Sequence, residues 1–132
     1  MYGKVFEALA LELKEKTGLM VEIEPEVASP SEPHLRIKPK SPTLKRDFME
    51  LNFELWFIAQ GSGLAMLDKV MDLSVKLTQI LRHFNISLGN AGFGVIFEKL
   101  SEGEFFINED EGSKPYVWIE KWKGKVLVKR DV

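Results

Sequence analysis

Few residues in this 132-residue chain have the types and spacing that chemistry requires, and a serine between two glycines is the first of them. Ser62 lies in the triplet Gly61-Ser62-Gly63, which invites comparison with the nucleophile of a hydrolase. That nucleophile needs the pattern Gly-x-Ser-x-Gly, and the residues on either side of the triplet do not complete it. A serine in front of a long amphipathic segment instead predicts a hydroxyl that caps a helix.

The two histidines, His34 and His83, do not have the spacing of a metal site. Neither belongs to a His-x-x-x-His or Glu-x-x-His pair, which would place two ligands on one helix face. We expect both at the surface. Asp68 and Asp72 do share a helix face, but Lys69 between them predicts a solvated charged surface. The sequence therefore predicts no catalytic residue, no metal and no cofactor, and we do not expect an enzyme.

The composition predicts a single globular domain without disulfides, because the chain has 132 residues and no cysteine. The N-terminal segment is charged and amphipathic, unlike the apolar core of a signal peptide. The longest apolar run, Leu55 to Ala59, is far shorter than the ~20 residues of a membrane span. The formal net charge of −2 argues against nucleic acid as the main partner. We therefore expect a soluble domain of intracellular type with no membrane partner.

A long strand followed by a long helix forms the centre of the predicted fold. The strand is predicted from Arg46 to Ile58, because Met49, Leu51, Phe53, Leu55 and Phe57 fall on alternate positions with Glu50, Asn52 and Glu54 between them, which is the period of a half-buried strand. From Leu64 to Phe84 the apolar residues follow helical spacing and predict one wide stripe that faces the core. Its members are Leu64, Met66, Leu67, Val70, Met71, Leu73, Leu77, Ile80, Leu81 and Phe84.

Shorter elements are expected on both sides of this pair. Residues 1–16 read as an amphipathic helix that ends before Gly18, and residues 19–24 as a strand. Five prolines between residues 25 and 42 predict a long excursion with one short strand at 34–38. Further strands are expected at 95–100 and 105–107, and as a hairpin of 116–122 and 125–130 that turns at Lys123-Gly124. The fold class is α+β, with a mostly antiparallel sheet packed against one long and one N-terminal helix.

Aromatic residues on the last predicted hairpin suggest a binding surface. Tyr116, Trp118, Glu120 and Trp122 alternate on one face, and several lysines lie nearby. Aromatic and basic side chains on a sheet can stack nucleic-acid bases, and aromatic residues are also enriched in protein interfaces. They are equally typical of a core. Three interpretations stay open: core, protein interface, or a site for a small ligand or single-stranded nucleic acid.

The order and size of these elements resemble the phage tail terminator or tail-completion proteins, the family typified by minor tail protein U. The resemblance is carried by the N-terminal helix ending at Lys16-Thr17-Gly18, the proline-rich region and the long strand and helix, and it extends to the C-terminal strands ending Val126-Leu127-Val128. It implies a structural protein of phages or prophages that forms a homo-oligomeric ring, commonly a hexamer. Such a ring caps the tail tube and offers a docking face to the head connector. The implied location is the host cytoplasm during assembly and then the virion tail.

The charge distribution independently suits association between copies. The proline-rich region is basic and the segment from Ser101 to Ser113 is acidic, so oppositely charged surfaces on one chain could meet head to tail. The predicted interface therefore contains Arg36, Lys38, Lys40, Lys45, Arg46, Glu109, Asp110, Glu111, Trp118 and Trp122. The expected partners are other copies of this chain, the tail tube protein and the head–tail connector proteins.

Overall fold

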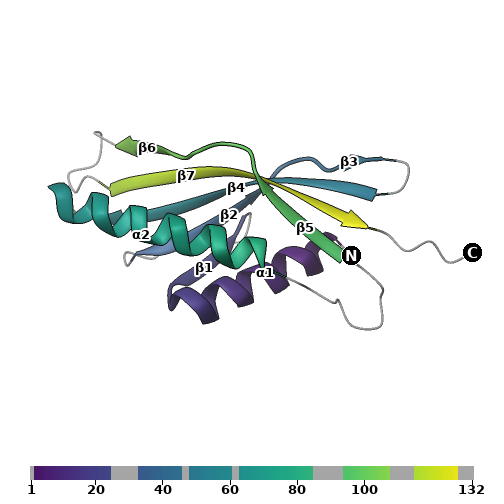
Figure 1. Ribbon diagram of the computed structural model, residues 1–132, viewed down its shortest axis with the longest axis horizontal. Coiled ribbons are helices and arrows are strands. Elements are labelled where there is room, and N and C mark those ends of the chain that lie inside the picture. The colour runs from purple at the N-terminus through teal and green to yellow at the C-terminus, as the bar shows by residue number, and fades with distance from the viewer. Residues whose placement is uncertain are drawn as a thin grey trace, which may run out of the picture.

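The computed structural model describes residues 2–24, 33–45, 48–60, 63–84, 94–107 and 115–127. Within these ranges two helices and seven strands follow one another, and Figure 1 shows their arrangement. In chain order they are α1 (Tyr2–Thr17), β1 (Met20–Ile23), β2 (His34–Pro39), β3 (Thr43–Leu44), β4 (Phe48–Gln60), α2 (Gly63–Arg82), β5 (Gly94–Lys99), β6 (Glu104–Ile107) and β7 (Pro115–Leu127).

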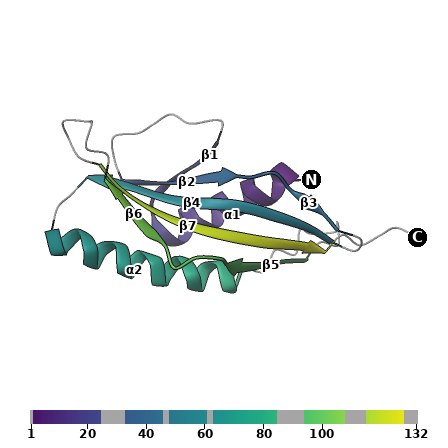
Figure 2. The same ribbon diagram turned by 90° about the horizontal axis from the view of Figure 1, so that it is seen from above.

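The strands form one mixed sheet in the order β1-β2-β4-β7-β5, with β3 paired to β4 and β6 paired to β7. Only the β1–β2 pair is parallel, and every other described pair is antiparallel. The two long strands β4 and β7 run almost the length of the molecule (Figure 2). The predicted α+β fold class with a mostly antiparallel sheet is confirmed.

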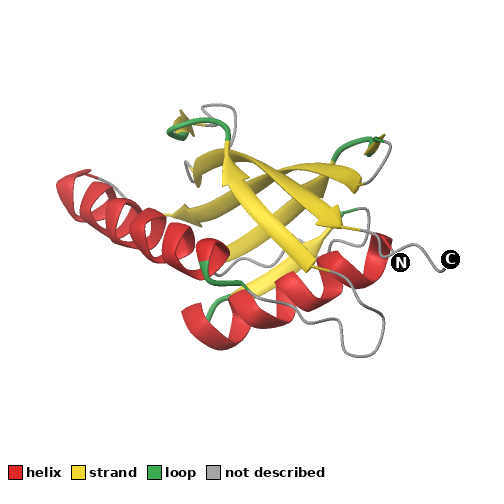
Figure 3. Cartoon of the chain, turned by 45° about the vertical axis from the view of Figure 1, so that its right-hand side comes forward, coloured by secondary structure: helices red, strands yellow, loops and turns green. Residues whose placement is uncertain are grey.

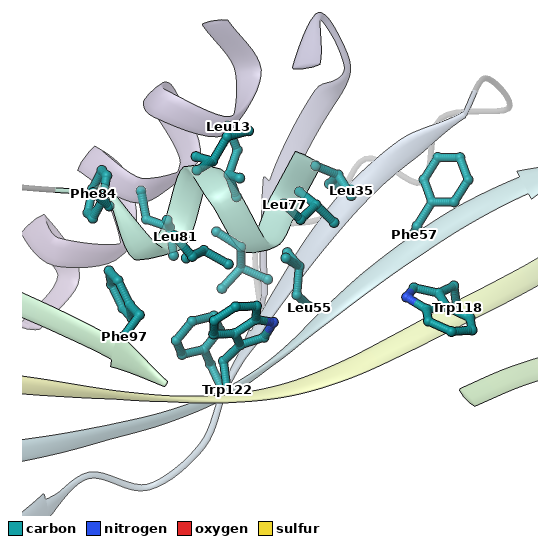
Figure 4. Packing of buried hydrophobic residues seen from close by; sticks show 14 of the residues in the cluster. Leu13, Leu35, Leu55, Phe57, Leu77, Leu81, Phe84, Phe97, Trp118 and Trp122 are labelled. Carbon is teal, nitrogen blue, oxygen red and sulfur yellow. The ribbon is translucent and has the colours of Figure 1, made fainter. Parts of the chain in front are cut away.

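Both helices pack on the same face of the sheet (Figure 3), which leaves the opposite face uncovered by either helix. The alternation predicted for β4 explains this packing, because Leu51, Phe53, Leu55, Phe57 and Ala59 are all buried. Figure 4 shows sheet residues such as Leu55 pointing toward α2. The helices bury their own stripes against this face, at Val5, Phe6, Leu9 and Leu13 in α1 and at Met66, Val70, Leu77, Ile80 and Leu81 in α2.

The end of α1 follows the sequence prediction closely. Gly18 adopts a left-handed conformation with φ of 73°, and its backbone N–H donates to the carbonyl of Lys14 at 2.9 Å. This geometry closes the last helical turn and favours glycine. The predicted cap at Ser62 lies outside the described residues.

The C-terminal hairpin predicted around Lys123-Gly124 is wrong, because β7 is a single strand. It pairs with β4 without a break from Phe48↔Leu127 to Gln60↔Pro115. Gly124 is buried in this strand, and a Cβ there would lie 2.8 Å from Cε1 of Phe97. The glycine therefore makes room for an aromatic ring from β5 rather than forming a turn. The structure also adds the short strand β3, which the sequence did not predict.

Candidate functional site

The two tryptophans predicted at an interface lie in the core. Trp118 and Trp122 project from β7 on the face covered by the helices, and only 7% and 1% of their surfaces are exposed. Of the interpretations left open by the sequence, the structure supports the core. Neither indole face is available to stack a base or to meet a partner, because the side chains are enclosed by their own chain.

Glu120 lies between the two tryptophans on β7 and is completely buried. Its Oε1 accepts a hydrogen bond from the indole N–H of Trp122 at 3.1 Å, and its Oε2 accepts one from Trp118 at 2.9 Å. Ser74 of α2 donates to the same Oε2 at 2.6 Å, and Nζ of Lys99 on β5 lies 3.3 Å from it. A buried carboxylate is costly unless it is paired and hydrogen-bonded, and this one meets both conditions.

This polar cluster connects three elements and is not an evident ligand site. Lys99 extends from β5 to the hydroxyls of Ser74 and Thr78 on α2, each at 3.3 Å, in addition to Glu120. Its three ammonium donors are therefore all directed at groups within the chain. The hydroxyl of Ser74 is likewise directed at Glu120. The cluster holds α2 in one position on the sheet. Its one sign in the sequence is a carboxylate, Glu120, on the same strand face as two tryptophans.

The connection between β5 and β6 covers the outer end of this cluster. Gly103 has a φ of 98° and packs directly on the indole ring of Trp118, where a Cβ would overlap the ring. Phe105 of β6 meets the same indole edge-on, with ring centroids 4.9 Å apart. Backbone and aromatic ring together therefore enclose Trp118 at the edge of the sheet.

Of the predicted basic residues, Arg36 and Lys38 lie on the uncovered side of the sheet, and these two and Lys40 form ion pairs within the chain. Arg36 lies 3.5 Å from Glu22 and 3.8 Å from Glu24, and Lys38 lies 3.5 Å from Glu24. Lys40 lies 3.7 Å from Glu54, and Lys45 is exposed. Arg46, Glu109, Asp110 and Glu111 lie outside the described residues. That the basic and acidic clusters face one another therefore remains a prediction.

His34 corrects one expectation, because it is 2% exposed rather than at the surface. It lies on the uncovered side of β2 with its Nε2 3.9 Å from Glu22. The same row holds Arg36, so an imidazole, a carboxylate and a guanidinium share the β1–β2 edge. The strand begins at His34 as predicted, but the surface expectation failed because this strand pairs with β1 on one side and with β4 on the other. His83 is exposed, as predicted.

The outer side of α2 carries a row of exposed apolar residues. Leu64, Leu67, Met71 and Val75 are 78%, 41%, 40% and 60% exposed, respectively. Their spacing of three, four and four residues places them along one side of the helix. We call them the outer stripe. Leu64, Leu67 and Met71 were expected in the core; the apolar arc of α2 is too wide for one sheet face to cover, so this part faces solvent.

The described residues contain no group of three or more His, Cys, Asp or Glu side chains placed to hold a metal ion. Within the same ranges, no helix is long and apolar enough to cross a membrane.

Comparisons with known proteins give the fold and nothing more specific. No protein-family model matches the sequence, and no curated protein matches it. One solved structure, whose name states no function, aligns over 95% of this chain and 92% of its own, with 13% sequence identity and a TM-score of 0.59. At this identity the likeness extends to the fold alone.

Proposed function

We propose that this protein is a structural assembly protein that forms a homo-oligomeric ring. In line with the resemblance noted above, the ring is of the kind that caps a phage tail tube and offers a docking face to the head connector. The observation that carries the proposal is the outer stripe, a row of four apolar side chains left exposed on the longest helix. Single exposed apolar residues are ordinary, but a row of them over three helical turns favours a protein interface.

The polar cluster around Glu120 supports the same interpretation. It fixes α2 to β5 and β7 through directional bonds, so the outer stripe is presented on a rigid element. A preformed surface loses less conformational entropy on association than a mobile one. An assembly protein that meets many identical copies benefits from such a surface.

The described part of the chain gives little support to the binding of ligands or single-stranded nucleic acid. Such a module needs exposed aromatic faces, and the indoles of Trp118 and Trp122 are buried and bonded to Glu120. Trp56 on the uncovered face is only partly buried, but Lys38 of the same chain lies over its ring. The uncovered sheet face carries acids as well as bases, as in the pairs of Glu50 with Lys123 and Glu54 with Lys40. A nucleic-acid surface is expected to be predominantly basic.

Tail-tube capping tests the proposal directly. Purified protein is added to polymerising phage tail tubes, and tube length and tube ends are examined by electron microscopy. We expect rings at one end of each tube and arrest of growth at that end. Tubes that grow at the same rate and carry no added density at either end would refute the tail-terminator role. A ring that forms in solution without meeting the tube would keep the assembly part and reject the proposed partner.

A further inference from the structure

The uncovered face of the sheet holds a second apolar surface, in addition to the outer stripe of α2. Trp56 and Ile58 of β4 lie directly opposite Ile119 and Val117 of β7, and all four side chains are only partly buried. We call these four residues the sheet block. Neither described helix packs on this face (Figure 3). Beside the block on the same face, Lys38 lies over Trp56, and His34, opposite Ile58, is 2% exposed.

The two surfaces lie on opposite layers of the same molecule. The outer stripe belongs to the helical layer, whereas the sheet block lies on the far side of the sheet from both helices (Figure 3). A copy that offers one surface can therefore accept a neighbour on the other. Contacts between two different surfaces repeat head to tail, and they close into a ring when the rotation between neighbours permits.

Charges beside the two surfaces are complementary. Asp68 and Asp72 are exposed on α2, next to the outer stripe and one turn apart. Lys121 is exposed on the face of the sheet block, two residues after Ile119. Lys38 lies over the ring of Trp56, with its Nζ 3.7 Å from the centroid, and is also paired with Glu24 of its own chain at 3.5 Å. Glu54, opposite Lys121, is already bonded to the indole N–H of Trp56 at 3.0 Å.

From these positions we infer that the outer stripe of one copy docks on the sheet block of the next copy. The helix covers a sheet face that the chain itself leaves open, which is the usual way for an amphipathic helix and a sheet to share a core. Asp68 and Asp72 then face the exposed Lys121 of the neighbour. The inference rests on the proposed self-assembly. It adds which two surfaces meet and that the contact runs head to tail, from the stripe of one copy to the block of the next.

Three variants test the two surfaces separately. Leu67→Ser/Met71→Ser removes the centre of the outer stripe, and Ile119→Lys places a charge in the sheet block. Leu11→Ser is the matched control, because Leu11 is 58% exposed on α1 and belongs to neither surface. Sedimentation equilibrium should show at least tenfold weaker self-association for the first two variants and unchanged association for the control. Circular dichroism verifies the fold, and Lys121→Glu on an exposed side chain replaces Ile119→Lys if that variant unfolds.

Mixing the two defective variants shows whether copies associate head to tail or symmetrically. One variant keeps an intact sheet block and the other an intact outer stripe, so an equimolar mixture regains one interface and should form a dimer that grows no further. Symmetric pairing of α2 with α2 would instead leave the Ile119→Lys variant fully associated, and this result would overturn the inference.

The same measurements separate this inference from the proposed function. If the wild type forms a ring and both surface variants form it equally well, the stripe-to-block contact is wrong but ring assembly still holds. A wild-type protein that is monomeric at every concentration and salt would overturn both.

Discussion

Replacement of Glu120 by leucine should destabilise the fold far more than its single position on β7 suggests. Leucine is similar in size but accepts no hydrogen bond, so the indole N–H groups of Trp118 and Trp122 lose their acceptor inside the core. Each unsatisfied buried donor costs about 1–3 kcal/mol. Lys99 also loses the carboxylate 3.3 Å from its Nζ, and breaking a buried pair on one side costs about 3–5 kcal/mol.

These contributions overlap, and we expect the free energy of unfolding to fall by about 3–5 kcal/mol for Glu120→Leu. Domains of this kind are stable by only about 5–15 kcal/mol, so the loss is large but measurable. Urea unfolding followed by far-ultraviolet circular dichroism is the assay, because tryptophan fluorescence would itself respond to the change near the indoles. Glu120→Gln keeps one acceptor oxygen and should lose less, about 1–3 kcal/mol.

Two further variants locate the cause of the loss. Glu50→Gln removes a carboxylate that lies 3.8 Å from Lys123 on the uncovered face, and it should cost at most about 1 kcal/mol. Adding Lys99→Met to Glu120→Leu should recover part of the loss, because the ammonium left without a carboxylate is then gone. A Glu120→Leu protein within about 1 kcal/mol of wild type would refute the reasoning, since Glu120 would then contribute no more than a surface charge.

Three other predictions concern glycines and the outer stripe. Gly103→Ala should destabilise by at least about 2 kcal/mol, because it combines a left-handed φ with overlap of the Trp118 ring; unchanged urea unfolding would contradict this. Gly124→Ala should cost about 1–3 kcal/mol in the same assay, since its Cβ meets Phe97 at 2.8 Å, and a stabilised variant would contradict the packing role. Leu67→Ser should change monomer stability by no more than about 0.5 kcal/mol, because the side chain is 41% exposed; a loss near that of a core leucine would place it in the core.

The sequence predicted the elements whose pattern is local. The period of two predicted along Met49 to Phe57 and the glycine stop after Thr17 are properties of neighbouring residues, and both are confirmed. The hairpin at Lys123-Gly124 failed because a glycine in a strand can serve a close approach from another strand, here Phe97 of β5. That contact joins residues far apart in the sequence, so the residues next to Gly124 do not predict it.

The candidate site was harder to predict for the same reason. Trp118 and Trp122 stood on one strand face with Glu120, but only the folded chain brings Ser74 and Lys99 to the carboxylate and so explains a buried charge. The outer stripe could not be distinguished in the sequence from the core residues of α2, because the helix is apolar over a wide arc. Spacing alone could not say which part of that arc the sheet covers.

The mass of the wild-type protein in solution tests the central claim most directly. Light scattering across a wide range of protein and salt concentrations gives the size and the cooperativity of any assembly. We expect the 15.1-kDa chain to form one closed species, of the mass of six copies for a hexameric ring, with no continued growth as concentration rises. A monomer under every condition would contradict self-assembly, and unlimited growth into filaments would contradict ring closure.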